Sequence, residues 1–429
     1  MKNLLIIAIA IVLVQCEPVI PQKSLPEKQI IFDNHEYEPQ IGNVKISPIE
    51  AGQLDILGNP VVNLEGSNQL FLDFDLLTDQ FENLSARIYH CNRDWKKSLL
   101  RDMEFLDEIN NFRITEFDYS VNTVQPYINY RFSIPKPKIS GNYVLAVFRR
   151  GNPQDVLFTR RFMVFQTAVT VNELVRVSTT INKREINQQI EFSLSYGNLL
   201  VNNPSQDIQV VILQNHNWYT AIDDISPTLI RANEGSLEFR HLDLRTNFAG
   251  WNEFRWTDLR TLSIAGRNVA RIQNTGTEIF AQLRTDQSRF ARRYTQNFQD
   301  INGQFTIQND DPGESSLNAD YVRARFILKN EKAAGKIYVT GQFNNWRLED
   351  KNLLQYDTQK QLYYTDLYLK QGYYDYMYHL EGGSLPAYQL EGSHFQTEND
   401  YEILVYYRNP GQINDQLMGY KKFKSIEDL

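Results

Sequence analysis

The residues able to do chemistry are scattered along this chain of 429 residues. The histidines stand alone, without the paired spacing that places two imidazoles on one helix face for a zinc ion, and the sequence contains no Cys-x-x-Cys unit. They are His35, His90, His216, His241, His379 and His394. This pattern predicts no metal site.

Nucleophiles and carboxylate pairs are equally sparse. Cys91 follows His90, which would suit thiol chemistry, but a cysteine at the end of an apolar strand is more often a small buried hydrophobe. Paired acids occur at Asp223-Asp224 and Asp310-Asp311, in loops, whereas a glycosidase needs two carboxylates that face each other across a bond. The sequence has no Gly-x-Ser-x-Gly elbow and no glycine-rich phosphate loop between a strand and a helix. We therefore predict a protein that is not an enzyme and uses no cofactor.

Two aromatic clusters are candidate ligand or partner contacts. Trp346 ends the cluster Gly341-Gln342-Phe343-Asn344-Asn345-Trp346, and the pair Trp218-Tyr219 follows Asn217. Exposed aromatic rings anchor ligands and protein interfaces, whereas buried rings pack under their own domain. Both alternatives are open for Trp346, Trp218 and Tyr219.

The elements that must position these residues are nearly all strands. Apolar residues alternate with polar ones over short segments, and turn-forming Gly, Asn, Ser and Pro separate them. A single short helix is expected over Trp95 to Glu104. Strands at roughly ten-residue spacing are typical of antiparallel β-sandwiches. The clearest predicted strands are 70–77, 85–89, 143–148, 161–165, 189–196, 208–213, 237–242, 321–328, 361–370, 373–380 and 401–407.

The length of the chain suggests about three domains. We expect the first sandwich over 30–166, the second over 167–308 and the third over 317–429, with the polar, turn-rich segment 309–316 as a linker. The prediction is an all-β protein of tandem, immunoglobulin-like antiparallel β-sandwiches.

Residues 1–16 have the pattern of an export signal. Lys2 precedes an apolar run from Leu4 to Val14, which is too short for a bilayer core that needs about 20 residues. Cys16 follows, as in bacterial lipoproteins, although Gln15 stands where a small residue is usual. Two alternatives stay open: lipidation of Cys16, or ordinary cleavage that leaves an unlipidated exported protein.

The chain has a net charge of -8. Such a charge disfavours non-specific attraction to nucleic acid or to an anionic lipid surface. We therefore expect no nucleic-acid partner and no membrane contact except through a lipid on Cys16.

The third segment resembles the sandwich module of glycogen-binding regulators and branching enzymes. The resemblance covers Gly341 to Trp346, Leu369 to Tyr378 and Glu381-Gly382. In sugar-binding members a lysine stands on the Tyr-x-Tyr strand, where this chain has Met377, and a second Trp follows the Asp-Gly turn, where Tyr388 is the nearest aromatic residue here. The resemblance implies the fold, and the two departures disfavour carbohydrate as a ligand of Trp346. The alternative function is a periplasmic carbohydrate-binding protein that uses this C-terminal sandwich.

A longer resemblance covers nearly the whole chain after residue 16. The chain resembles the type IX secretion system plug proteins of the Bacteroidetes. That family implies an exported, non-enzymatic protein in the periplasm, at the inner face of the outer membrane. Its implied partner is a large outer-membrane translocon barrel, whose periplasmic opening it closes by protein–protein contact. The resemblance rests on Tyr89 to Trp95, Asp118 to Ser120 with Asn122, Thr123 and Tyr127, Ser140 to Leu145, Arg160 to Val164, and Glu391 to Tyr401.

Overall fold

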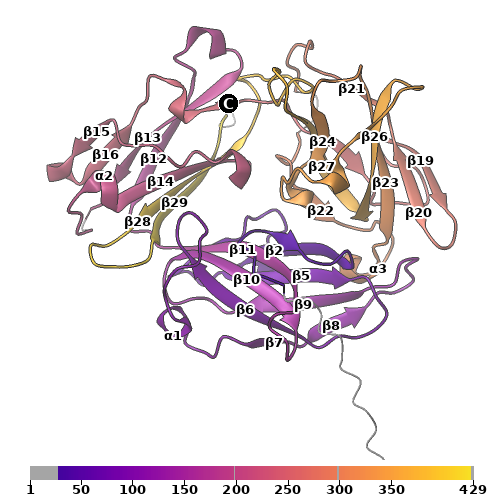
Figure 1. Cartoon of the computed structure of the whole chain (residues 1–429), viewed down its shortest axis with the longest axis horizontal. Coiled ribbons are helices and arrows are strands. Elements are labelled where there is room, and N and C mark those ends of the chain that lie inside the picture. Colours follow the sequence, from indigo (N-terminus) through magenta and orange to yellow (C-terminus); the bar gives the residue numbers. More distant parts are fainter. Residues whose placement is uncertain (1–27, 198, 297–298, 427–429) are drawn as a thin grey trace, which may run out of the picture.

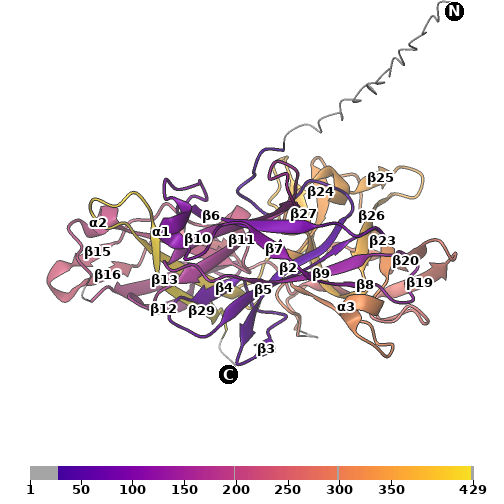
Figure 2. The same ribbon diagram turned by 90° about the horizontal axis from the view of Figure 1, so that it is seen from below.

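A computed structural model describes residues 28–197, 199–296 and 299–426. It confirms the all-β prediction, with strands gathered into three sandwiches (Figure 1). In that view the first sandwich lies below, the second above it on the left and the third above it on the right. Figure 2 shows the molecule from below, with the first sandwich lying across the other two.

The first sandwich consists of two antiparallel sheets, of order β1-β11-β10-β6-β7 and β3-β2-β5-β9-β8, with β4 added parallel to β11. Even-numbered apolar residues of β5 face the core between the sheets, as the alternation predicts. Its elements are β1 (His35–Glu36), β2 (Ile41–Glu50), β3 (Gln53–Leu54), β4 (Val61–Asn63), β5 (Gln69–Leu76), β6 (Leu84–Cys91), α1 (Asp102–Phe105), β7 (Phe112–Ile114), β8 (Glu116–Tyr119), β9 (Ile128–Ile134), β10 (Gly141–Arg149) and β11 (Val156–Phe165).

The helix predicted over 95–104 is wrong for most of its length, because only α1 is helical. Trp95 has a left-handed backbone with φ 61°, which no helix tolerates. The amide of Ser98 donates to the carbonyl of His90 at 2.9 Å, so this segment folds back onto the end of β6 instead.

The second sandwich pairs the sheet β12-β13-β16-β15, in which β17 also joins β13, with the sheet β14-β28-β29. Its core contains apolar residues from both sheets. In the first of these sheets, Phe192 of β13 and Phe239 of β16 stack with 4.4 Å between ring centroids. Its elements, in which η marks a 3-10 helix, are β12 (Thr170–Val177), η1 (Ile181–Lys183), β13 (Asn187–Ser195), α2 (Pro204–Asp207), β14 (Ile208–Gln214), η2 (Trp218–Thr220), β15 (Leu229–Arg231), η3 (Ala232–Glu234), β16 (Ser236–Phe239), η4 (Leu244–Thr246), β17 (Asn247–Ala249), β28 (Asp400–Tyr407) and β29 (Gln416–Lys424).

The third sandwich pairs the sheet β19-β20-β23-β26-β25, with β21 on β23, and the sheet β18-β27-β22, with β24 on β27. A tyrosine-rich face of β27 fills its core. Its elements are β18 (Arg255–Asp258), β19 (Val269–Asn274), β20 (Ile279–Leu283), β21 (Asp286–Gln287), β22 (Phe305–Ile307), α3 (Ser315–Asn318), β23 (Tyr321–Lys329), β24 (Lys336–Thr340), η5 (Gln342–Asn344), η6 (Asp350–Asn352), β25 (Gln355–Asp357), β26 (Leu362–Lys370) and β27 (Gly372–Glu381).

The sheets do not follow the continuous boundaries 167–308 and 317–429 expected from the sequence. β28 and β29, at the end of the chain, pair with β14 of the second sandwich, shown in yellow at the left of Figure 1. β18 to β22, expected in the second sandwich, belong to the sheets of the third. The third sandwich is therefore inserted between β17 and β28 of the second, because strand pairing, not sequence order, decides which sheet a strand joins.

Candidate functional site

The neighbours Cys91 and His90 do not form a catalytic pair. As consecutive residues of β6, they point to opposite faces of the sheet. Burial raises the pKa of Cys91 to about 12 and lowers the pKa of His90 to about 4. Because the thiolate is the nucleophile, a buried thiol with this pKa is inert at neutral pH. Cys91 instead packs as a small apolar side chain.

The described part of the chain contains neither a cluster of metal-binding side chains nor a membrane-spanning helix. Among those residues, no three His, Cys, Asp or Glu side chains are grouped to hold a metal ion. None of the helices within the same ranges has the length and apolar character needed to cross a bilayer. Cys16 and the predicted export signal lie outside the described residues.

Trp346 is a packing residue of the third sandwich. The amide of Gly341 donates to Asn344 Oδ1 at 3.1 Å, and Trp346 N donates back to the carbonyl of Gly341 at 2.9 Å, which closes the turn. The indole is only 7% exposed and packs on Phe254 and Met377. A sugar cannot stack on this buried ring, so the turn defines a fold and not a ligand platform.

Trp218 and Tyr219 contact the first sandwich, not the core of their own domain. They lie on η2, where Asn217 Oδ1 accepts from the amide of Tyr219 at 2.9 Å. The Trp218 ring meets Trp95 edge-on with 5.0 Å between centroids, and the Tyr219 hydroxyl donates to Asp33 Oδ2 at 2.9 Å. The contacts of this pair lie at an interface within the chain, between the first and second sandwiches.

The three predicted contact residues converge at one junction of the sandwiches. Tyr219 and Trp346 line a cavity of about 430 Å³, together with Trp251, Met377 and His379. Trp218, Tyr219 and Trp346 also line an adjoining cavity of about 70 Å³. Residues more than a hundred positions apart are thus brought together where the chain folds on itself.

The backbone at this junction is unusual. Trp95, Trp251 and Trp346 have left-handed φ angles of 61°, 57° and 61°. Bulky residues avoid this region, and such conformations persist only where the surroundings hold them in place. Gly303, itself at φ 79°, lies against Trp346, because a Cβ there would come within 2.3 Å of the indole. The packing around the junction therefore holds these backbone conformations in place.

An ion pair buried at the contact of the first and third sandwiches connects them. Lys370 Nζ of β26 lies 2.7 Å from Asp75 Oδ2 of β5, and both residues are fully buried. The Tyr321 hydroxyl donates to the same oxygen at 2.6 Å, and Asn129 Nδ2 donates to Asp75 Oδ1 at 2.9 Å. Lys370 also lies over the Tyr127 ring at 4.2 Å. A charge pair with this many partners fixes the two sandwiches in one orientation.

An apolar core connects the first and second sandwiches. Cys91, Trp95, Val144 and Met163 of the first sandwich pack with residues of β14, β28 and β29. Beside them, the buried carboxylate of Glu402 accepts from Asn59 Nδ2 at 2.5 Å and lies 2.9 Å from His216 Nδ1. The second sandwich residues in this core are Val211, Leu213, Leu404, Tyr406 and Leu417.

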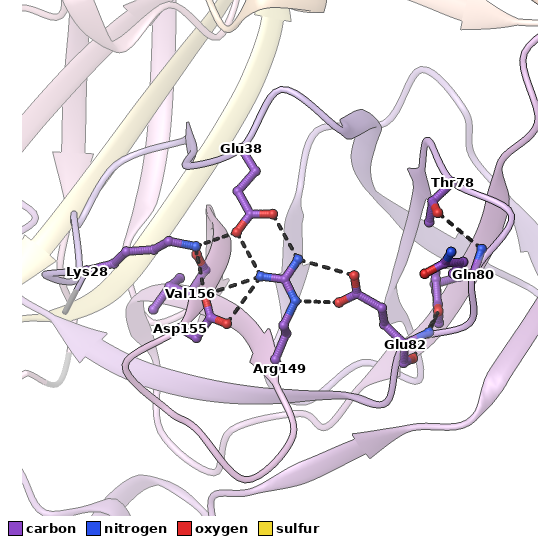
Figure 3. A network of polar contacts seen from close by, with 9 residues as sticks. Lys28, Glu38, Thr78, Gln80, Glu82, Arg149, Asp155 and Val156 are labelled. Atoms are coloured by element: carbon purple, nitrogen blue, oxygen red, sulfur yellow. Dashed lines mark hydrogen bonds and ion pairs between the residues drawn. The ribbon is translucent and has the colours of Figure 1, made fainter. Parts of the chain in front are cut away.

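A network around Arg149 holds the start of the described chain to the first sandwich (Figure 3). The guanidinium donates to both oxygens of Glu38, at 2.8 and 2.9 Å, and also to Glu82 and Asp155. Lys28 Nζ donates to Asp155 at 2.8 Å. Arg149 and Lys28 lower the pKa of Glu38 to about 2, although partial burial opposes them. The segment from residue 28 onward is therefore fixed to the domain.

The ion pair of Asp75 and Lys370 could not be predicted from the sequence patterns. Asp73 and Asp75 alternate with the core residues of β5, which is the pattern of a solvated face. The third sandwich covers that face, and burial together with the Asp75 charge raises the pKa of Asp73 to about 6. The only available signal was Lys370 at the end of an apolar strand.

Comparison with known proteins agrees with this architecture. Over 92% of its length the chain superimposes on the whole of a crystal structure of a hypothetical protein from Parabacteroides merdae, with a TM-score of 0.86 and 28% sequence identity. No curated protein matches the sequence. Residues 19–166, which end one residue after β11, match the family model described as the type 9 secretion system plug protein 1st domain. The first sandwich is therefore similar to the first domain of the type IX secretion system plug proteins.

Proposed function

We propose that this chain closes the periplasmic opening of the outer-membrane translocon pore of the type IX secretion system by protein–protein contact. The match of residues 19–166 to the first domain of the plug proteins supports a role as a component of that system in the cell envelope. The match of the first sandwich to the plug model is the observation that carries the proposal.

The interfaces between the sandwiches support this function physically. A plug resists pressure from cargo only if its parts do not rotate against one another. Inter-domain contacts that are small and polar allow such rotation, whereas large apolar ones do not. Here the first sandwich meets the second through an apolar core and the third through the buried Asp75–Lys370 pair.

Lipidation of Cys16 would place the plug near its pore. Lys28, the first described residue, is fixed to Glu38 and Asp155. Eleven residues lie between it and Cys16. Such a segment spans at most about 40 Å, so a lipid on Cys16 would hold the first sandwich within that distance of the bilayer. Confinement of this kind raises the local concentration near the translocon without a new protein contact.

Co-purification from native outer membranes tests the proposal. We expect a tagged chain to bring down a large outer-membrane barrel protein. We also expect cells that lack the chain to take up a large antibiotic normally excluded by the outer membrane. A Lys96→Met variant, changed at an exposed residue, should restore the barrier. Repeated purification without a barrel, together with unchanged uptake in the deletion strain, would overturn the proposal.

The carbohydrate-binding alternative finds no support at the site. Trp346 is buried, and Met377, at the position of the lysine in sugar-binding modules, packs against it. The third sandwich is better explained as a structural part of the plug.

A further inference from the structure

The end of the second sandwich carries an exposed apolar cluster. Ile181 on η1 is 79% exposed and Leu242 is 82% exposed, and Val177 and Leu244 are about half exposed beside them. We call residues 174–186 and 240–246 the tip. The tip lies at the C-terminal end of β12, whereas the N-terminal end of this strand is joined to the first sandwich. A group of such exposed apolar side chains in one place is unusual on a protein surface and marks an interaction site.

The two loops of the tip are held together, so its apolar residues form one surface. Thr179 Oγ1 donates to the carbonyl of Leu242 at 3.1 Å. Gln189 Oε1 accepts from the amide of Thr179 at 3.0 Å, and Gln189 Nε2 donates to the carbonyl of His241 at 2.8 Å. A single buried glutamine on β13 therefore fixes both loops, and the tip needs no ordering before it binds.

The local charge around this apolar cluster is positive, whereas the net charge of the protein is negative. The tip contains five Lys or Arg and two Asp or Glu, a local charge of +3 on a chain whose net charge is -8. Arg176, Arg240 and Arg245 approach Glu191, Glu238 and Asp243 at its edges. For Lys183 and Arg184, which flank Ile181 at its C-terminal side, no carboxylate lies within ion-pair distance among the described residues. The expectation from net charge alone, that the protein avoids anionic surfaces, does not hold locally.

A second exposed apolar patch differs from the tip in its charge. Leu99, Met103 and Ile109, around α1, are also almost fully exposed. The segment 99–109 contains one Arg and four Asp or Glu, a local charge of -3. The two patches match in apolar exposure and differ in the sign of their charge.

We propose that the tip docks on an anionic lipid bilayer, with Ile181 and Leu242 inserted among the acyl chains and Lys183 and Arg184 against the headgroups. Exposed apolar side chains beside cations are the features by which peripheral proteins bind such surfaces, each cation near the surface adding about a fivefold gain in affinity. This contact needs neither a lipid on Cys16 nor the translocon, and it would orient the molecule relative to the membrane.

Vesicle co-sedimentation tests the proposal with a chain that begins at Glu17, which keeps every described residue and excludes both leader and lipid. We expect binding to phosphatidylglycerol–phosphatidylcholine vesicles at low salt, loss of binding at high salt, and none to phosphatidylcholine alone. Ile181→Ser/Leu242→Ser should weaken binding roughly tenfold or more. Lys183→Gln/Arg184→Gln should weaken it about 25-fold at low salt.

The acidic patch supplies the matched control. Leu99→Ser/Ile109→Ser removes similar exposed apolar side chains and should bind vesicles like the unchanged chain. All variants should keep the same thermal unfolding, since every changed side chain is on the surface. The proposal is overturned if the unchanged chain fails to bind anionic vesicles, or if the control loses binding while the tip variants keep it. Vesicle-free binding of the tip to a purified barrel protein, without lipid binding, would also overturn it.

Discussion

The buried pair of Asp75 and Lys370 gives the sharpest prediction about how the sandwiches are held together. Lys370→Met keeps the length of the side chain and removes its charge, so the carboxylate of Asp75 is left buried. Tyr321 and Asn129 still donate to it, at 2.6 and 2.9 Å. Those two neutral donors replace only part of what an ammonium at 2.7 Å supplies.

The expected loss follows from what remains after the substitution. Removing one partner of a buried ion pair typically costs about 3–5 kcal/mol, because an uncompensated charge stays in a low dielectric. With two donors left in place we expect the lower end, about 3 kcal/mol in the free energy of unfolding. Urea unfolding followed by tryptophan fluorescence measures it, and hydrogen exchange should show the loss first in β5 and β26.

Two further variants separate burial from charge. Lys96 lies 2.7 Å from Asp94, the same separation as the buried pair, but its side chain is 83% exposed. Lys96→Met should therefore change the free energy of unfolding by less than about 1 kcal/mol. Asp75→Asn/Lys370→Met removes both charges of the pair, and it should recover at least about 2 kcal/mol of the loss. If Lys370→Met costs no more than Lys96→Met, or if the double variant is as unstable as the single one, the pair does not hold the interface.

Three other predictions concern buried groups. Burial and the neighbouring Asp300 carboxylate raise the pKa of Asp375 from 3.8 to about 8, so the folded state keeps a proton that the unfolded chain has released. The contribution of Asp375 to the free energy of unfolding is therefore greatest at low pH and falls as the pH rises from the unfolded pKa to the folded one. Asp375→Asn should flatten this fall, as urea titrations at several pH values can measure. If the free energy of unfolding falls as steeply with pH in the variant as in the unchanged chain, the prediction is wrong. Trp346→Ala should cost about 3–5 kcal/mol, seen as a lower melting temperature, while calorimetry of the unchanged chain with soluble glucans gives no heat. A melting temperature like that of the unchanged chain would mean that the indole is not packed. Cys91, buried with a pKa of about 12, should resist iodoacetamide in the native chain from Glu17 and gain one adduct in denaturant, as mass spectrometry can show; rapid native labelling would refute its burial.

Local patterns in the sequence were enough to predict most strands. The alternation in 70–77 became β5 (Gln69–Leu76), and the apolar run at 208–213 became β14 (Ile208–Gln214). Period-two patterning is a local property, and a buried face imposes it whatever partner the sheet has. Trp95 was misassigned because its left-handed backbone depends on contacts with Trp218 and Arg161, which are distant in sequence.

The partners of these elements could not be predicted. The strand over 401–407 has the same composition whether it closes the third sandwich or returns to the second. Its pairing with β14 is decided by the complementarity of two distant apolar faces. Asp75 shows the same limit for the site, since a polar residue facing another domain looks like one facing water.

The return of β28 and β29 to the second sandwich explains how the molecule resists hinge motion. The inserted third sandwich leaves the second at Gly250 and comes back at Asn399, so two segments cross between the domains. Asn399 Nδ2 donates to the carbonyl of Gly250 at 2.9 Å, and the amide of His394 donates to the carbonyl of Trp251 at 2.8 Å. The segments are so close that a Cβ on Gly250 would lie 1.9 Å from the carbonyl oxygen of His394.

A paired connection of this kind resists rotation that a single flexible linker would allow. The first sandwich then contacts both of the others, the second through an apolar core and the third through Asp75 and Lys370. The three domains therefore form a closed triangle, in which no sandwich can swing away unless two of its contacts break together. If the chain closes a pore, opening must then move it as one body, and the force that releases it must act on its outer surface and not on a hinge within it.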